Sequence, residues 1–175
     1  EFIADVGIKK GEKIDYAIMR DGRPIILIEC KAAGTNLDTE HAVRIQSGFA
    51  DLDRLTGGFA RGDLVVVAAR TSVGKTAYAL NLVRNVAVRF NHHALVLSAE
   101  MSGAQIAQRF LAVESGVDSV RIREGRLSQI EVGRIGEAFD ALSAAPIWYD
   151  DEPNIRLANI LSRTAALHET DHLDL

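Results

Sequence analysis

The 175-residue sequence has almost no cysteine and no excess of positive charge. Cys30 is its only cysteine, which excludes a disulfide framework or a cysteine-ligated zinc site and fits the reducing cytoplasm. The formal net charge is −4, so any contact with nucleic acid must be local. We find no signal peptide and no apolar run approaching the length of a membrane span. The composition therefore predicts a cytoplasmic globular protein without a membrane partner.

The most informative stretch is residues 63–76, which read DLVVVAARTSVGKT. Residues 64–67 form a continuous apolar run rich in β-branched side chains, which predicts a central parallel strand covered on both faces. Residues 74–76 read Gly-Lys-Thr, the second half of the phosphate-binding pattern G-x-x-x-x-G-K-[ST]. Ala69 stands in the place of the first glycine, so the strict pattern is missed by one methyl group.

The order of strand, loop and helix in this stretch suits the binding of a phosphate. Backbone N–H groups and the helix dipole converge on the helix N-terminus, and Gly74 permits close approach of the backbone. Lys75 can reach the β- and γ-phosphates of ATP, and the Thr76 hydroxyl can ligate Mg²⁺. The alternative is an ordinary strand–helix junction with a chance Gly-Lys-Thr. We predict a nucleotide-binding loop made of Ala69, Arg70, Thr71, Ser72, Val73, Gly74, Lys75 and Thr76.

The first part of the chain predicts a β-hairpin. Residues 13–19 and 24–29 are apolar-rich runs separated by a turn that contains Asp-Gly, a strong hairpin signal. Asp15 is on the first run, and Glu29 and Lys31 are at the end of the second. Positions two apart on a strand share a face, so two carboxylates could hold Mg²⁺ while the lysine positions a water molecule. A hairpin with a charged rim is the alternative explanation.

A family resemblance covers the same segment. EFIADVGIKKGEKIDYAIMRDGRPIILIECK resembles the N-terminal nuclease region of type I restriction enzyme R subunits, over residues 1–37. That family has a helix before this segment and further strands and helices after it, which this sequence does not supply. We therefore expect a structural hairpin, and keep a Mg²⁺-dependent DNA endonuclease centred on Asp15, Glu29 and Lys31 as an alternative.

From Gly48 the sequence resembles a different family. GFADLDRLTGGFARGDLVVVAARTSVGKT is similar to the ATPase domain of bacterial replicative DNA helicases of the DnaB type, and the similarity continues to the C-terminus. In that family the loop reads A-x-x-x-x-G-K-[ST], which Ala69 matches. The resemblance implies an α/β, RecA-like P-loop core with an incomplete parallel sheet flanked by helices. We expect a hairpin segment over residues 1–33, a linker over 34–47 and the ATPase domain over 48–175.

A second strand, residues 94–98, is followed by Glu100. We expect this strand to complete a β-α-β unit with the strand before the loop. A carboxylate just beyond a central strand lies where α/β sheets place their ligands. The resemblance implies that Glu100 activates the water molecule that attacks the γ-phosphate. The alternative is a plain acid at a strand end.

Apolar spacing and caps predict the helices around these strands. Ser102 with Gln105 and Ser128 with Glu131 have the spacing of capping boxes. The expected inward-facing residues of the helices after the loop and after Ser128 are Ala79, Leu82, Val83, Val86, Phe90, Ile135, Ala138, Phe139 and Leu142. We expect Trp148 in the core and a solvated turn at His92 and His93.

Arg121, Arg123 and Arg126 form a short basic cluster. One interpretation is a solvated turn. The other is contact with a neighbouring subunit or with a DNA phosphate.

The helicase resemblance implies ATP-driven unwinding of DNA by a homo-oligomeric ring, a hexamer in the full-length family, with a single strand in its channel and ATP and Mg²⁺ bound. In that family a strand with a metal-orienting acid, DNA-binding loops and an arginine finger follow the position of Leu175. We therefore expect this chain to bind ATP better than it hydrolyses it. A third hypothesis is a catalytically inactive nucleotide-binding module that assembles in response to ATP.

Overall fold

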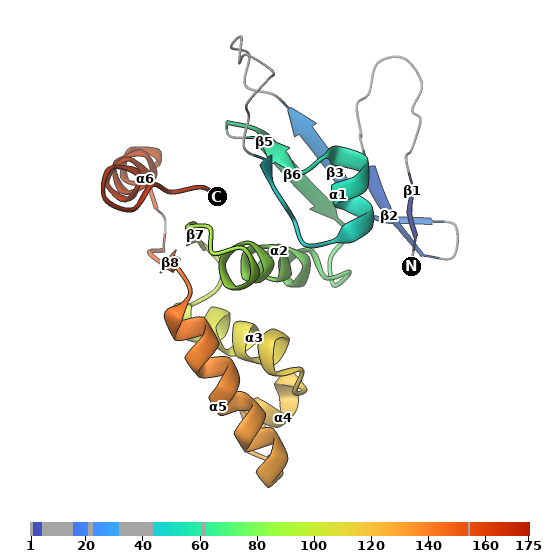
Figure 1. Cartoon of the computed structure of the whole chain (residues 1–175), viewed down its shortest axis with the longest axis vertical. Coiled ribbons are helices and arrows are strands. Elements are labelled where there is room, and N and C mark those ends of the chain that lie inside the picture. Colours follow the sequence, from blue (N-terminus) through green and yellow to red (C-terminus); the bar gives the residue numbers. More distant parts are fainter. Residues whose placement is uncertain (1, 5–15, 21–22, 32–43, 61, 154) are drawn as a thin grey trace. The chain divides into compact units, whose positions relative to one another are not determined.

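The computed structural model describes residues 2–4, 16–20, 23–31, 44–60, 62–153 and 155–175. The chain divides into two units, residues 1–79 and 80–175, and the boundary falls inside α2 (Lys75–Arg84). Figure 1 shows strands and helices in both units, which confirms the α/β class expected from the sequence. In the described ranges, no helix is both long enough and apolar enough to cross a membrane.

The first unit is built on an antiparallel sheet in the order β1-β2-β3-β6. Its strands are β1 (Phe2–Ala4), β2 (Tyr16–Arg20), β3 (Arg23–Lys31) and β6 (Leu64–Ala69). β2 and β3 form the predicted hairpin. Its turn residues, 21 and 22, lie outside the described residues, as do residues 34–43 of the predicted linker.

The pairing of β6 differs from the prediction. β6 pairs antiparallel with β3, with Ile26 opposite Ala69 and Lys31 opposite Leu64. Exposure alternates along β6, and the side chains of Leu64 and Val66 are 60% and 42% exposed. The expectation of a parallel strand covered on both faces was therefore wrong. A continuous run of β-branched residues favours a strand, but it does not specify the partner strand or the direction of pairing.

The rest of the first unit is a small layer that leads into β6. It contains β4 (Arg44–Ile45), α1 (Ala50–Thr56) and β5 (Phe59–Ala60), with β4 and β5 paired antiparallel. Ile45, Leu52 and Phe59 are its buried apolar residues. Gly57 ends α1 in the left-handed conformation, with φ of 72°, which glycine adopts without steric cost.

The second unit contains a parallel β-α-β arrangement. β7 (Ala94–Leu97) pairs with β8 (Ile147–Asp150). The chain between them forms α3 (Gly103–Ser115), α4 (Ser119–Glu124) and α5 (Gln129–Ala144), and α6 (Leu157–Asp171) follows β8. The strand expected to complete a β-α-β unit with β6 thus pairs with β8 among the described residues. The crossover runs through α3 to α5 and not through α2.

The core of the second unit is formed by residues of α2, α3, α5, β7 and β8. Leu80, Ile106 and Phe110 are its buried centre, and partly buried residues pack around them: Val83, Val96, Met101, Leu142 and Ile147. Both predicted capping boxes are confirmed, at Ser102 and at Ser128.

Two predicted inward-facing aromatic residues are exposed instead. Phe90 is 40% exposed because a π-helical segment, η1 (Asn85–Arg89), follows α2 and its wider turn shifts the helical period. Phe139 is 60% exposed, whereas its neighbour Ala138 is buried. Adjacent residues of a helix point about 100° apart, and in α5 it is Ala138 and not Phe139 that faces the core.

Candidate functional site

The predicted phosphate loop has the local conformation of a strand-to-helix connection. β6 ends at Ala69, a turn closes from Arg70 to Val73 with a backbone hydrogen bond of 3.4 Å, and α2 begins at Lys75. Ser72 and Gly74 have positive φ values of 64° and 108°. These left-handed positions bend the chain sharply before the helix.

The N-terminus of α2 presents free backbone donors beside the loop. Gly74 accepts the first helical hydrogen bond, from the Tyr78 N–H at 2.8 Å. The N–H groups of Lys75 and Thr76 therefore open the helix and have no carbonyl within it to bond. The Lys75 side chain is exposed and the Thr76 side chain is half-buried. Backbone donors, a cation and a hydroxyl thus occur together, as phosphate binding requires.

The segment before the loop is tied to α2 within the first unit. The Asp53 carboxylate accepts hydrogen bonds from the backbone N–H groups of Ser47 (2.7 Å) and Gly48 (3.0 Å). The adjacent Phe49 ring stacks on Tyr78 of α2, with ring centroids 5.2 Å apart. Tyr78 is only 8% exposed. These contacts hold residues 47–53 against the helix that follows the loop.

Glu100 follows β7 in a closed turn of the second unit. The Ser98 hydroxyl accepts from the Met101 N–H at 2.9 Å and donates to the Met101 carbonyl at 2.8 Å. The Glu100 side chain projects from this turn and is exposed. The turn fixes where the carboxylate leaves the strand. Glu100 and Lys75 belong to different units, so each is positioned within its own unit only.

The turn that carries Glu100 is also braced from β8. The Asp151 carboxylate accepts a 2.7 Å hydrogen bond from the Gly103 N–H, and Ser102 caps the same end of α3. Arg163 of α6 contacts Asp150 and lies 2.6 Å from Glu152. Sequence reasoning missed the part played by these acids, although an acid after a strand and next to a helix N-terminus is a recognisable signal.

The last residues of the chain pair with β7. The Leu95 N–H donates to the Leu175 carbonyl at 2.8 Å, and the Leu175 N–H donates to the His93 carbonyl at 3.0 Å. Leu175 is thus hydrogen-bonded to the residues immediately before and after Ala94. This is the hydrogen-bond pattern of two parallel strands. The N–H of Ala94 points the other way, to the Pro146 carbonyl beside β8. Leu175 therefore lies along the β7 edge opposite β8.

The histidines before β7 are not a solvated turn, contrary to expectation. The Asp174 carboxylate accepts from the His93 N–H at 3.1 Å and lies 3.3 Å from Nδ1 of His92. The His93 ring stacks on Trp148, with centroids 5.2 Å apart. Trp148 itself is half-buried and not fully in the core. The carboxylate could not be found from local spacing because it is distant in sequence.

The basic cluster is divided by its contacts. Arg121 donates to Glu131 at 2.8 Å, and Arg126 lies 3.2 Å from Glu124. Hydrogen bonds from the backbone N–H and hydroxyl of Ser128 hold the pKa of the Glu131 carboxyl below its usual value. Arg123, in contrast, lines a cavity.

The nuclease-like residues are only partly described. Glu29 and Lys31 lie in β3, in register with Val66 and Leu64 of β6, and Asp15 lies outside the described residues. Their predicted role stays a prediction. Among the described residues, no three His, Cys, Asp or Glu side chains gather as metal ligands.

Comparison with known proteins identifies relatives of most of the chain. The family model described as the DnaB-like helicase C terminal domain matches residues 44–175. The chain is 41% identical over 131 residues to the replicative DNA helicase DnaB of Geobacillus stearothermophilus and 39% identical over 131 residues to the replicative DNA helicase DnaC of Bacillus subtilis. Each alignment covers 75% of this chain but only 29% of the relative. The chain thus spans less than a third of the length of these relatives.

Two solved structures have a similar fold. A structure of a DnaB-like replicative helicase and its interactions with primase has a TM-score of 0.67 at 25% identity, covering 75% of this chain and 32% of that chain. A second structure, described as an ATPase domain, has a TM-score of 0.64 at 23% identity, covering 77% of this chain and 48% of that one. The RecA-like α/β fold expected from the sequence is confirmed.

Proposed function

The chain belongs to the DnaB-like helicase C-terminal domain family, and we propose that it is the ATP-binding part of a replicative DNA helicase. The observation that carries the proposal is the loop of residues 69–76. It joins a strand to a helix N-terminus, with Gly74 at φ of 108° and the N–H groups of Lys75 and Thr76 opening the helix. This arrangement favours bound phosphate.

Three residues of the loop have distinct parts in this proposal. The Lys75 ammonium neutralises the β- and γ-phosphates, and Gly74 lets the backbone approach them. The half-buried Thr76 hydroxyl is the protein oxygen that would hold Mg²⁺, which prefers oxygen ligands. When bound, the ion shields the phosphate charge. Ala69, Arg70, Thr71, Ser72 and Val73 shape the turn that presents these groups.

Glu100 is the proposed general base. It lies just after β7, in a turn that Ser98 closes. Its exposed carboxylate can accept a proton from a water molecule. In the proposed whole protein, subunits assemble as a ring around single-stranded DNA and nucleotides are hydrolysed to drive unwinding. A hexamer is the proposed assembly.

Two variants separate phosphate binding from proton transfer. Titration of a fluorescent ATP analogue with Mg²⁺ should show an affinity loss of at least roughly tenfold in Lys75→Ala, since hydrogen bonds to charged groups contribute about 1.5–3 kcal/mol. Glu100→Gln should bind the analogue as the unsubstituted chain does and release less phosphate from ATP. Arg54→Ala, which removes an exposed cation of α1, is the matched control. Equal affinity in Lys75→Ala and the control would refute the proposed loop.

A second candidate function is Mg²⁺-dependent DNA cleavage, supported by the placement of Glu29 and Lys31 on one strand, β3. Incubation of plasmid DNA with the full chain and Mg²⁺ should then give nicked or linear products that disappear in Lys31→Ala. An intact plasmid under these conditions would remove this candidate.

A further inference from the structure

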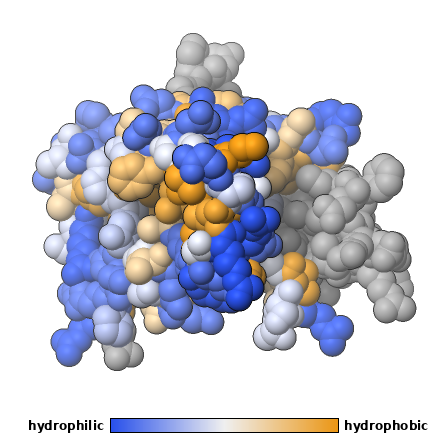
Figure 2. All heavy atoms as spheres, turned by 90° about the horizontal axis from the view of Figure 1, so that it is seen from below, coloured by the Kyte–Doolittle hydropathy of each residue, from blue (hydrophilic) through white to orange (hydrophobic). Residues whose placement is uncertain are grey.

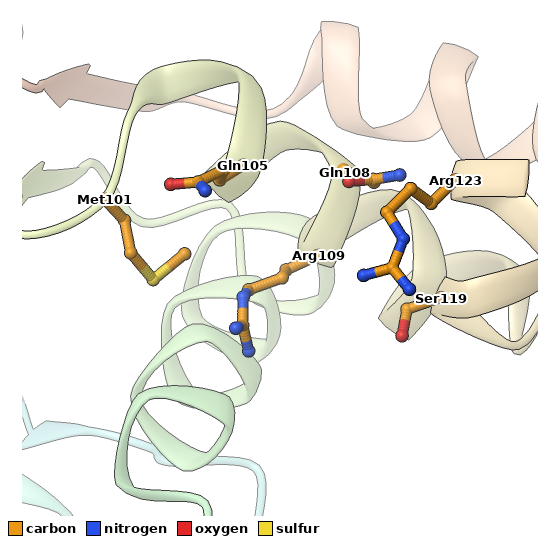
Figure 3. Close-up of a pocket in the computed structure, with 6 residues that line it drawn as sticks. All are labelled: Met101, Gln105, Gln108, Arg109, Ser119 and Arg123. Carbon is orange, nitrogen blue, oxygen red and sulfur yellow. The ribbon is translucent and has the colours of Figure 1, made fainter.

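A cavity of about 240 Å³ in the second unit has the chemistry of an anion site. It is lined by Met101, Gln105, Gln108, Arg109, Ser119 and Arg123. Figure 3 shows Arg109 of α3 and Arg123 of α4 at this cavity, with the Arg123 guanidinium turned toward Ser119 and the Arg109 guanidinium turned away from Gln105 and Gln108. Its lining contains two cations and three neutral polar residues, with neither a carboxylate nor an aromatic ring. Figure 2 shows an apolar patch surrounded by hydrophilic side chains on the face of the molecule seen from below.

Helical spacing explains why these side chains meet. Gln105, Gln108 and Arg109 are three and four positions apart on α3, and so share one face. Ser119 and Arg123 are four apart on α4 and share a face in the same way. The cavity lies where these faces adjoin, next to the turn that ends in Met101. The site is therefore built from rigid elements and not from a loose surface loop.

The polar groups around the cavity are predominantly donors. The Gln105 side-chain oxygen accepts the Ser102 N–H at 3.1 Å, so its amide NH₂ is the end that remains available. Arginine has donors only, and serine can donate. Three acids, Glu100, Asp118 and Glu124, are adjacent in sequence to cavity residues, and none of them lines the cavity. Asp118 accepts hydrogen bonds from the N–H groups of Val120 and Arg121, and Glu124 pairs with Arg126. A ligand that accepts hydrogen bonds and carries negative charge matches this set.

The two cavity arginines differ from their neighbours in their partners. Arg121 and Arg126 pair with glutamates, whereas Arg109 and Arg123 have no carboxylate partner in the described part of the chain. Two guanidinium groups that line one cavity give it a positive potential, which favours a bound anion. Guanidinium groups also match the oxygens of phosphate in geometry.

We propose that this cavity binds a phosphate group through Arg109 and Arg123, with Gln105, Gln108 and Ser119 as additional donors. Because no aromatic ring lines the cavity for a base to stack on, recognition is of phosphate and independent of base sequence. This supplies the local basic contact that a chain of net charge −4 would need to bind nucleic acid. The site does not include residues 69–76, so a negative result for this cavity would leave the proposed nucleotide loop unaffected.

The test uses two phosphate probes on the full chain. The first is a fluorescein-labelled oligothymidylate of about 20 nucleotides, followed by anisotropy, and the second is pyrophosphate, followed by calorimetry. Arg109→Gln and Arg123→Gln should each weaken binding by about tenfold, as expected for loss of a charge-assisted hydrogen bond. For the oligonucleotide, the slope of log affinity against log salt should shrink by about 0.7 for each phosphate that the variant no longer neutralises.

Matched variants control for charge and folding. Arg156→Gln removes another exposed arginine of the same unit, outside the cavity, and should leave both probes unaffected. Arg109→Lys keeps the charge and should retain part of the affinity. Melting temperature and binding of the ATP analogue report on the fold and on the separate loop.

The results distinguish the source of the phosphate. If binding of the oligonucleotide weakens when Arg109 or Arg123 is replaced, the site is supported and its ligand is a nucleic-acid backbone. If only binding of pyrophosphate weakens, the site is supported and its ligand is a free phosphate. If neither probe depends on these arginines, the proposal is overturned. An oligoglutamate peptide serves as a further probe. If its binding requires these arginines while binding of both phosphate probes does not, the phosphate proposal is overturned and the cavity binds an acidic protein segment instead.

Discussion

Gly74→Ala tests the loop by adding a single methyl group. Gly74 has φ of 108°, which L-residues with a side chain rarely adopt. The added Cβ would meet only the Ala77 Cβ, at 4.0 Å, so no clash opposes it. The effect on folding is therefore conformational, and we expect the free energy of unfolding to fall by about 1–3 kcal/mol. The methyl group also stands where the backbone would approach a phosphate.

Gly57→Ala separates these two effects because it lies in the same unit. Gly57 also has positive φ, 72°, and open space around its Cβ position, with the nearest atom of Arg44 at 3.8 Å. Its replacement should lower the free energy of unfolding by about 1–2 kcal/mol, the cost of the left-handed conformation. Unlike Gly74→Ala, it should leave nucleotide affinity unchanged, because Gly57 ends α1 and not the phosphate loop.

Urea denaturation followed by circular dichroism measures the stability change, and titration with a fluorescent ATP analogue measures affinity. The reasoning predicts lower stability in both variants and weaker nucleotide binding in Gly74→Ala alone. Nucleotide affinity that is equal in the two variants would refute the assignment of Gly74 to close phosphate contact. Unchanged stability in Gly74→Ala would refute the conformational argument.

Two further predictions concern the second unit. Phe110→Ala should lower the free energy of unfolding by about 3–5 kcal/mol, whereas Phe139→Ala should change it by less than about 1 kcal/mol, because Phe110 is 5% exposed and Phe139 60% exposed. Urea melts of both variants check this, and equal losses would contradict the assigned core. The hydrogen bonds from Ser128 lower the pKa of Glu131, so this carboxylate stabilises the fold above its unfolded pKa and loses that contribution as pH falls through its folded pKa. Thermal melts across acid pH should show a shallower fall in Glu131→Gln, and an identical pH profile would argue against this cap.

The sequence predicted local structure well where one short motif determines it. The hairpin of β2 and β3, the capping boxes at Ser102 and Ser128, and the helix that begins at Lys75 all depend on residues within a few positions of each other. The resemblance of residues 48–175 to DnaB-type helicases was confirmed through a family model. The resemblance of residues 1–37 to restriction enzymes stays a prediction.

Features that depend on distant partners could not be predicted in the same way. The apolar run of β6 does not reveal that it pairs with β3, and the spacing of α2 does not reveal the π-helical segment that rotates Phe90 outward. Asp174 is more than 80 positions from the histidines it contacts. The cavity at Arg109 forms where α3 and α4 meet, and the sequence does not show that these helices are neighbours. The spacing of Gln105, Gln108 and Arg109 does predict one polar face of α3.

The central claim is that the backbone and lysine of residues 69–76 hold the phosphates of ATP. Hydrogen–deuterium exchange with and without ATP and Mg²⁺ tests it directly, because bound phosphate oxygens should protect the backbone N–H groups of the loop. We predict slower exchange over residues 70–77 in the unsubstituted chain and little or no protection in Lys75→Ala at the same nucleotide concentration. Protection elsewhere in the chain, or equal protection of the loop in Lys75→Ala, would contradict the account.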